Sequence, residues 1–308
     1  MSFSYFVKRP GVRATLAAAM LTAAVAGCGQ EAVGRLAAQP GTSPQAVSPP
    51  APPASGAAPS PAAPRLTLDD ARKAAESWLA DHNRTVKDRH WWDDDATRDR
   101  LFAFGTRHEI VLERGSFEDG RGKPRKPITL TGERTYYVPR DQPPDGEWFI
   151  LRATYKGQDR AHVLAFWREP GRPFKLAAKT PLHYGQKVPE PVRDAEGYVT
   201  AAPPLDGLQI ARAYMNFWEY PSREGGAGGY RLAKDNYSRR SYPAVTKGLY
   251  AAYRSHSPPH GFRTADGGSF YLFSLLNKPE GIVNVLTVGV ATRKGGKAVH
   301  EIAGDWFA

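Results

Sequence analysis

Cysteine is almost absent from this chain, because Cys28 is the only one among 308 residues. A single cysteine cannot form an intramolecular disulfide, so the folded part must be held together by its hydrophobic core alone. If Cys28 is consumed by a modification, the chain also has no thiol left to act as a nucleophile.

Signatures of common catalytic and phosphate-binding sites are missing as well. No Gly-x-Ser-x-Gly nucleophile elbow occurs, and the glycines within residues 225–229 are not followed by the Lys-Ser or Lys-Thr of a phosphate loop. Pro258 and Pro259 stand between His256 and His260 and prevent the two histidines from sharing a helix face. We therefore assign no catalytic, cofactor-binding or metal-binding residue, and we favour a binding module over an enzyme.

One apolar run, residues 14–27, lies near the N-terminus. It is too short for a relaxed transmembrane helix but has the length of the apolar region of a secretory signal. The residues before this run include three basic ones and no acidic one, as in the positive region of such signals. The basic residues are Lys8, Arg9 and Arg13. The run therefore predicts export.

The end of this run, Val25-Ala26-Gly27-Cys28, resembles the lipobox of bacterial lipoproteins, which has an aliphatic residue, two small residues and an obligatory cysteine. The resemblance implies that residues 1–27 are a signal peptide and that Cys28 is lipidated with diacylglycerol and palmitate-type chains. Two or more chains anchor a protein stably, so we expect it on the extracytoplasmic face of the cell membrane. The alternative is an ordinary secreted protein cleaved near Ala26.

The formal net charge is +11, and three of these positive charges precede Cys28, which leaves a surplus of eight. A basic exported protein can meet anionic lipid headgroups or an anionic envelope polymer, whereas export argues against nucleic acid. The bias towards Ala, Pro, Arg and Gly is typical of high-GC Gram-positive bacteria, the actinobacteria.

Composition divides the remaining chain into segments. Residues 28–65 contain mainly Ala, Pro, Ser, Gly and Gln and cannot bury enough apolar surface to fold, so we predict a disordered linker acting as a semi-rigid spacer. Residues 66–185 are predicted to form a first α+β domain and residues 186–204, with four prolines, a connector. Residues 205–308 are predicted to form a second α+β domain that is smaller or incomplete.

Within the first domain, apolar residues at helical spacing predict a helix over 67–84. Residues 99–113 read as a mixed segment that ends in a strand. Short turns then separate four strand-like runs, which predicts an antiparallel meander with the helix packed on one face of the sheet. These runs are 135–138, 148–155, 162–168 and 174–179.

The second domain repeats the order of helix and then sheet. A helix is expected over 205–218, a second helical stretch over 242–254, and strands around the turn at 266–268, over 283–292 and over 298–307.

Several polar groups were weighed as sites. His82, His90 and the acidic run 93–95 fit no known metal-ligand spacing, and Glu113 and Glu133 can be placed in one cavity only by the fold. The basic loop 120–127 is expected to be solvated, with contact to an anionic surface as the alternative. A cell-envelope hydrolase with a scattered active site remains the second functional hypothesis.

A wider resemblance rests on three short motifs: His82-Asn83-Arg84-Thr85, Trp148-Phe149, and the turn Phe262-Arg263-Thr264-Ala265-Asp266-Gly267-Gly268. They are similar to a group of actinobacterial lipoproteins of unknown function over most of residues 66–308. The expected units are also similar to the nuclear transport factor 2-like fold, in which a curved sheet wraps round a helix. Neither resemblance implies a catalytic residue or a cofactor.

Overall fold

The computed structural model describes residues 65–219, 226–245, 253–277 and 284–307. These described residues belong to one compact unit. The predicted signal peptide, Cys28 and almost all of the predicted linker lie outside the described residues. No helix in the described ranges is long and apolar enough to cross a membrane.

The first half of the chain builds a four-stranded antiparallel sheet in which the strands follow one another in sequence order. This is the predicted meander. Its strands are β1 (Leu130–Tyr137), β2 (Glu147–Tyr155), β3 (Ala161–Arg168) and β4 (Lys175–Pro181).

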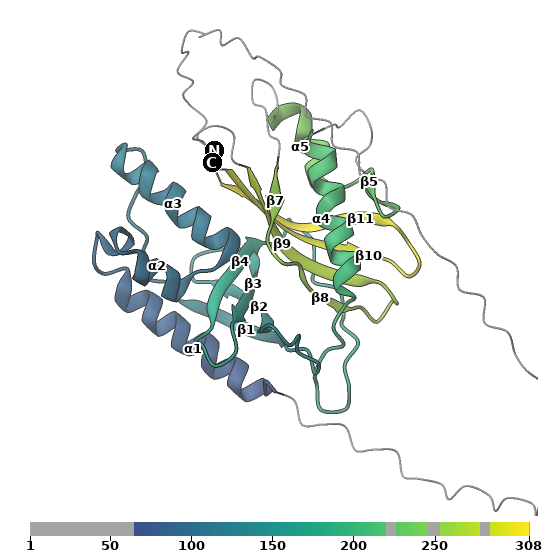
Figure 1. The fold of residues 1–308 in the computed structure, drawn as a ribbon, viewed down its shortest axis with the longest axis horizontal. Helices are drawn as coiled ribbons and strands as arrows, with labels where there is room; N and C mark the ends of the chain where they lie inside the picture. Colours follow the sequence, from purple (N-terminus) through teal and green to yellow (C-terminus); the bar gives the residue numbers. More distant parts are fainter. Residues whose placement is uncertain (1–64, 220–225, 246–252, 278–283, 308) are drawn as a thin grey trace, which may run out of the picture. The chain divides into compact units, whose positions relative to one another are not determined.

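Four helical elements accompany this sheet (Figure 1). The first begins at Thr67 because of a capping box: the Thr67 side chain accepts the backbone N–H of Asp70 at 3.0 Å, and the Asp70 carboxylate accepts from Thr67. The predicted helix over 67–84 is therefore confirmed. The elements are α1 (Leu68–Thr85), η1 (Trp91–Asp93), α2 (Asp95–Leu101) and α3 (Phe104–Glu118).

The prediction of a strand at the end of residues 99–113 is wrong, because residues 104–113 belong to α3. Buried positions in α3 recur at helical spacing, at Gly105, Thr106, Glu109 and Ile110. Tertiary packing, and not local propensity, makes these residues helical. A Cβ on Gly105 would lie 2.1 Å from the Oγ of Ser274, so the helix approaches the second sheet closer than any larger residue allows.

The second half builds a seven-stranded sheet, larger than the first, so the expectation of a smaller second sheet is wrong. It is mostly antiparallel; β6 and β11 pair in parallel, and β8 pairs with β9. The helices are α4 (Pro204–Glu219) and α5 (Tyr237–Val245), so the predicted stretch 242–254 overlaps the end of α5 and otherwise falls partly on residues outside the description. The strands are β5 (Gly226–Ala227), β6 (Tyr230–Leu232), β7 (Ser255–His256), β8 (His260–Arg263), β9 (Ser269–Asn277), β10 (Asn284–Thr292) and β11 (Ala298–Phe307).

The fold is α+β, with helices packed on antiparallel-dominated sheets, and its cores define four layers (Figure 1). Along β2, Phe149 and Leu151 face α1, whereas Trp148 and Ile150 face the second sheet. On the second sheet, Phe273 packs against α4. The order is helices, first sheet, second sheet, helix. Each half thus has its own helix-and-sheet core, and a third core joins the two sheets.

The predicted connector, 186–204, pairs with both halves of the fold while many of its side chains are exposed. Isolated bridges pair Pro191 with Thr264 and Ala201 with Phe262 on the second-sheet side. Val199 pairs with Pro139, which follows β1. The connector therefore contributes backbone hydrogen bonds that join the two halves.

Candidate functional site

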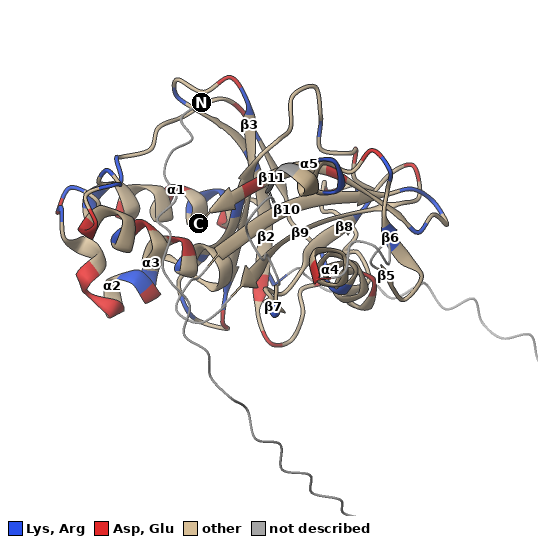
Figure 2. Ribbon diagram, turned by 90° about the horizontal axis from the view of Figure 1, so that it is seen from above, with Lys and Arg blue, Asp and Glu red and all other residues tan. Residues whose placement is uncertain are grey.

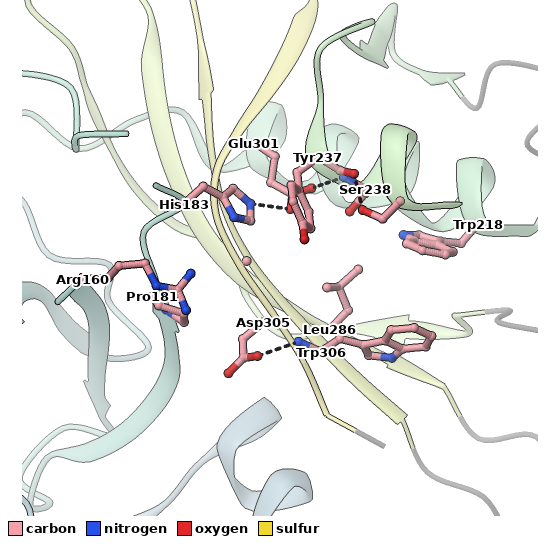
Figure 3. A pocket seen from close by; sticks show the side chains of 12 residues that line it. Arg160, Pro181, His183, Trp218, Tyr237, Ser238, Leu286, Glu301, Asp305 and Trp306 are labelled. Atoms are coloured by element: carbon pink, nitrogen blue, oxygen red, sulfur yellow. Dashed lines mark hydrogen bonds and ion pairs between the residues drawn. The ribbon is translucent and has the colours of Figure 1, made fainter. Parts of the chain in front are cut away.

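A cavity of about 330 Å³, here called the Glu301 cavity, lies where the end of β4 meets β11 and the helices α4 and α5 (Figure 3). The backbone N–H of His183 donates to the carbonyl of Ile302 at 2.8 Å, which joins the two sheets at this point. The lining residues are Arg160, Pro181, His183, Trp218, Tyr237, Ser238, Ser241, Leu286, Glu301, Gly304, Asp305 and Trp306.

One wall of the Glu301 cavity is a polar network centred on the Glu301 carboxylate. The Nε2 atom of His183 lies 3.0 Å from Oε1, and because a carboxylate only accepts, this nitrogen carries the hydrogen. The backbone N–H of Ser238 donates to Oε2 at 3.1 Å. The ring of Tyr237 stacks on that of His183 with 4.2 Å between the centroids. Glu301 thereby fixes the orientation of the imidazole.

Two fully buried side chains support Glu301 from behind. The hydroxyl of Tyr214 donates to Oε2 at 3.0 Å and accepts from the Asn236 amide at 2.7 Å. Burial, reinforced by the neighbouring carboxylate, holds the pKa of Tyr214 well above its usual value, so this hydroxyl stays a donor. A Cβ at position 304 would lie 2.5 Å from Oε1 of Glu301, so a larger residue there would displace this carboxylate from its network.

The opposite wall is apolar and aromatic. Trp218, Leu286 and Trp306 lie there, and the two indole rings are tilted with centroids 6.2 Å apart. The Nε1–H of Trp306 donates to the side-chain oxygen of Asn284. By contrast, Nε1 of the buried Trp218 has no hydrogen-bond partner among the described residues, and Figure 3 shows it on the side of the ring that faces the other lining residues. A buried donor without an acceptor costs about 1–3 kcal/mol.

A second, more polar cavity of about 400 Å³ shares His183 and Glu301 with the first. It is also lined by the pair His300 and Asp235, with 3.1 Å between Nδ1 and the nearer carboxylate oxygen. The His183–Glu301 pair therefore belongs to the walls of both cavities.

The structure does not bring the weighed metal ligands together. His82 is buried on α1 and stacks on Trp78 with 5.0 Å between the ring centroids, whereas His90 is exposed. Asp94 caps α2 by accepting the backbone N–H of Ala96 and that of Thr97. Among the described residues, no group of three or more His, Cys, Asp or Glu side chains is arranged to hold a metal ion.

The other weighed residues are also separated. Glu113 pairs with Arg125, a residue of the basic loop whose side chain is only 10% exposed, while Glu133 is exposed on β1. His256 lies on β7 and His260 on β8. The interpretation of Asp266 as a turn residue is confirmed, because its carboxylate accepts the Thr264 hydroxyl at 2.5 Å and the Gly268 N–H at 3.1 Å.

Sequence reasoning missed His183, Trp218 and Glu301 as site residues. Their only local signal was an acidic residue, Glu301, directly before the apolar Ile302 and Ala303 of the last predicted strand. His183 and Glu301 are 118 positions apart, so only the contact between β4 and β11 makes them neighbours.

A family model described as "Domain of unknown function (DUF8094)" matches residues 63–283, which is more than half of the chain, so the protein belongs to this family. The match ends before β10, so Glu301 and Trp306 lie beyond it. No curated protein and no solved structure matches the chain significantly.

Proposed function

We propose that this protein is a lipid-anchored binding protein of the extracytoplasmic face of the cell membrane, and that the Glu301 cavity holds its ligand. The observation that carries the proposal is the combination of a polar wall, fixed by Glu301, with an aromatic wall in which the Trp218 donor is unpaired. Ligand sites are commonly concave and mainly apolar, with a few polar groups that fix orientation. The ligand would therefore have an apolar or aromatic body and a polar acceptor.

Charge suggests the kind of polar group. Arg160 and His183 line the cavity together with Asp305 and Glu301, and Glu301 is already occupied by three donors. Arg160 is held over the ring of Tyr184, with 4.8 Å between the guanidinium carbon and the ring centroid. An anionic acceptor on the ligand would meet Arg160, because the N–H of His183 is already donated to Glu301.

The anchor is tested by Cys28→Ala. Without the thiol no lipid can be attached, so we expect the protein to leave the membrane fraction for the medium, or to remain as an unprocessed precursor. Immunoblots of cell fractions measure this, with Ser48→Ala in the predicted linker as a control that stays with the membrane. An unchanged membrane fraction for Cys28→Ala would contradict the lipidation of Cys28.

The cavity is tested by a thermal-shift screen of the full-length protein in neutral detergent against divalent metals, cell-wall fragments and short-chain lipids. A ligand at 100 times its Kd stabilises the fold by about 2.7 kcal/mol, which corresponds to a rise in Tm of about 5–10 °C for a chain of this size. Ser241→Trp places an indole in the cavity and should abolish the shift. Arg212→Trp, an exposed site on α4 outside the cavity, should leave it intact. A shift that survives Ser241→Trp would exclude this cavity.

A hydrolase of the cell envelope is the second candidate, favoured by the His183–Glu301 pair. A carboxylate that fixes one ring nitrogen as a donor leaves the other nitrogen free to take up a proton, as a general base requires. Compounds found in the same screen distinguish the two functions, because a binding protein returns them unchanged whereas a hydrolase releases products that chromatography detects.

A further inference from the structure

A third cavity, here called the arginine cleft, has a volume of about 510 Å³ and shares no residue with the Glu301 cavity. It lies between α1, the end of α2 and the turn from β3 to β4. Its lining residues are Ala74, Ser77, Trp78, Ala80, Asp81, Arg84, Arg100, Leu101, Arg168, Pro173 and Phe174. Three arginines from three different elements thus line the cleft, and Asp81 is the one acidic residue among its lining residues.

The arginines of α1 and α2 are oriented by the same carboxylate. Arg84 donates from Nη2 to Oδ1 of Asp81 at 2.9 Å, and Arg100 pairs with the other oxygen, Oδ2. Arg100 also donates to the Thr85 hydroxyl at 3.3 Å. A guanidinium has five N–H donors, so both arginines keep donors that these contacts do not use.

The third arginine is held from the sheet side. Arg168 donates to Oε2 of Glu147 at 2.5 Å, and its guanidinium carbon lies 4.4 Å from the ring centroid of Phe174. Of the residues that line the cleft, three are arginines and one, Asp81, is acidic. Arg168 is additionally paired with Glu147 and its charge acts on Asp70. Figure 2 shows acidic and basic residues close together on the helices of this half.

The rest of the cleft is apolar. Trp78 is buried and its Nε1–H is already used, donating to the carbonyl of Leu101 at 2.8 Å. Phe174 and Pro173 complete the apolar surface. A ligand of this cleft would therefore have an anionic end that meets the guanidinium groups and an apolar part that covers Trp78.

We propose that the arginine cleft binds a small phosphate-bearing molecule with an apolar portion. A planar carboxylate is satisfied by one guanidinium fork, whereas a tetrahedral phosphate has oxygens directed to several sides and suits donors that come from three elements. The same chemistry occurs in soluble phosphate monoesters and in anionic lipid headgroups. The site is independent of the ligand proposed for the Glu301 cavity.

Isothermal titration calorimetry of the full-length protein in neutral detergent tests this with two probes, phenyl phosphate and dihexanoyl-phosphatidate. Zwitterionic dihexanoyl-phosphatidylcholine is the control probe. Saturable binding of one molecule of either anionic probe is expected. Tighter binding of the phosphatidate would identify a lipid headgroup as the source, and tighter binding of phenyl phosphate a soluble ester.

Matched variants test whether the measured heat of binding comes from the arginine cleft. Arg84→Gln with Arg100→Gln removes charge-assisted hydrogen bonds and should weaken binding about tenfold or more. Arg72→Gln, on the same helix but paired with Asp69 outside the cleft, should leave the Kd unchanged. Asp81→Asn removes the competing carboxylate and should tighten binding several-fold, which a merely structural role would not produce.

Three results would overturn the proposal. One is the absence of saturable heat from both anionic probes at about 10 mM, well into the weak-binding range. Another is equal affinity of the double arginine variant and Arg72→Gln. The third is binding of the zwitterionic lipid as tight as that of the phosphatidate, which would show that only the apolar surface of the cleft is used.

Discussion

Lowering the pH from 7 to 5 is expected to destabilise this fold by about 2 kcal/mol for each of three buried histidines. His82, His162 and His260 are 0%, 7% and 5% exposed. Burial lowers the pKa of each to about 4, against about 6.5 in an unfolded chain. The unfolded chain therefore binds more protons between these two values, so the stability is present above pH 6.5 and is lost as the pH falls towards 4. The combined loss is comparable to the total stability of most domains.

The surroundings of the three rings explain why burial dominates. Each ring lies against an aromatic side chain (Trp78 for His82, Tyr155 for His162 and Trp148 for His260), and each has one ring nitrogen without a hydrogen-bond partner among the described residues. Protonation would place an unpaired N–H⁺ in the core. Charged neighbours also affect the pKa of each ring. They are Arg125, Glu113 and Lys179 for His82, Lys179 and Arg160 for His162, and Asp145 for His260.

Urea unfolding at pH 7 and pH 5 measures the effect. His260→Phe keeps the ring contact with Trp148 but cannot be protonated, so it should reduce the pH-dependent loss by about 2 kcal/mol. His90→Phe changes an exposed ring and should leave the loss unchanged. If His260→Phe and wild type lose the same stability on acidification, His260 is not a buried neutral group.

Replacing Lys179 by Met is expected to destabilise the fold by about 3 kcal/mol, the lower end of the range for removing one partner of a buried ion pair. The Nζ atom of Lys179 on β4 lies 3.2 Å from Oε2 of Glu109 on α3, and their side chains are 21% and 5% exposed. The Thr287 hydroxyl on β10 lies 3.4 Å from the other carboxylate oxygen. The pair therefore lies where α3 contacts both sheets, and the variant leaves the Glu109 carboxylate buried without its cation.

The pKa values of the pair support this assignment. Burial raises the pKa of Glu109, against the opposing effect of Lys179. Burial by itself would lower the pKa of Lys179, but the neighbouring Glu109 carboxylate raises it above its usual value. The ammonium group is thus held in its charged form by the carboxylate that it stabilises.

A double-mutant cycle separates the pair from its surroundings. Because an apolar pair of similar volume often replaces a buried ion pair without loss, Glu109→Leu combined with Lys179→Met should recover much of the stability lost in Lys179→Met. Lys73→Met disrupts an exposed pair with Asp69 and should leave the urea midpoint unchanged. If Lys179→Met costs no more than Lys73→Met, the pair does not contribute to stability.

Local sequence patterns predicted those helices and strands whose periodicity can be recognised from their own residues. The helix that begins after Thr67, the meander from β1 to β4 and the strands β9 to β11 were expected from spacing and turns, because each side-chain face is repeated within one short segment. Helix α3 was missed because Gly105 and the β-branched Thr106 and Ile110 oppose helix formation locally. Its packing against both sheets overrides that propensity.

The candidate sites were outside the reach of such patterns. Glu301, His183 and Trp218 come from β11, from the segment after β4 and from α4, and in the arginine cleft Arg84 and Arg100 share Asp81 across two helices. The spacing of these residues along the chain does not reveal that they are close in space, because the fold brings them together from separate elements.

By itself, the sequence determined the α+β class, the division into two helix-and-sheet halves and the absence of disulfides, and it predicts the lipid anchor at Cys28. These follow from local periodicity and from residue counts, which need no tertiary contact. Only the tertiary structure decided that the sheets pack face to face and that α3 lies against both. It also decided which polar side chains meet, because burial and electrostatic pairing depend on residues far apart in the chain.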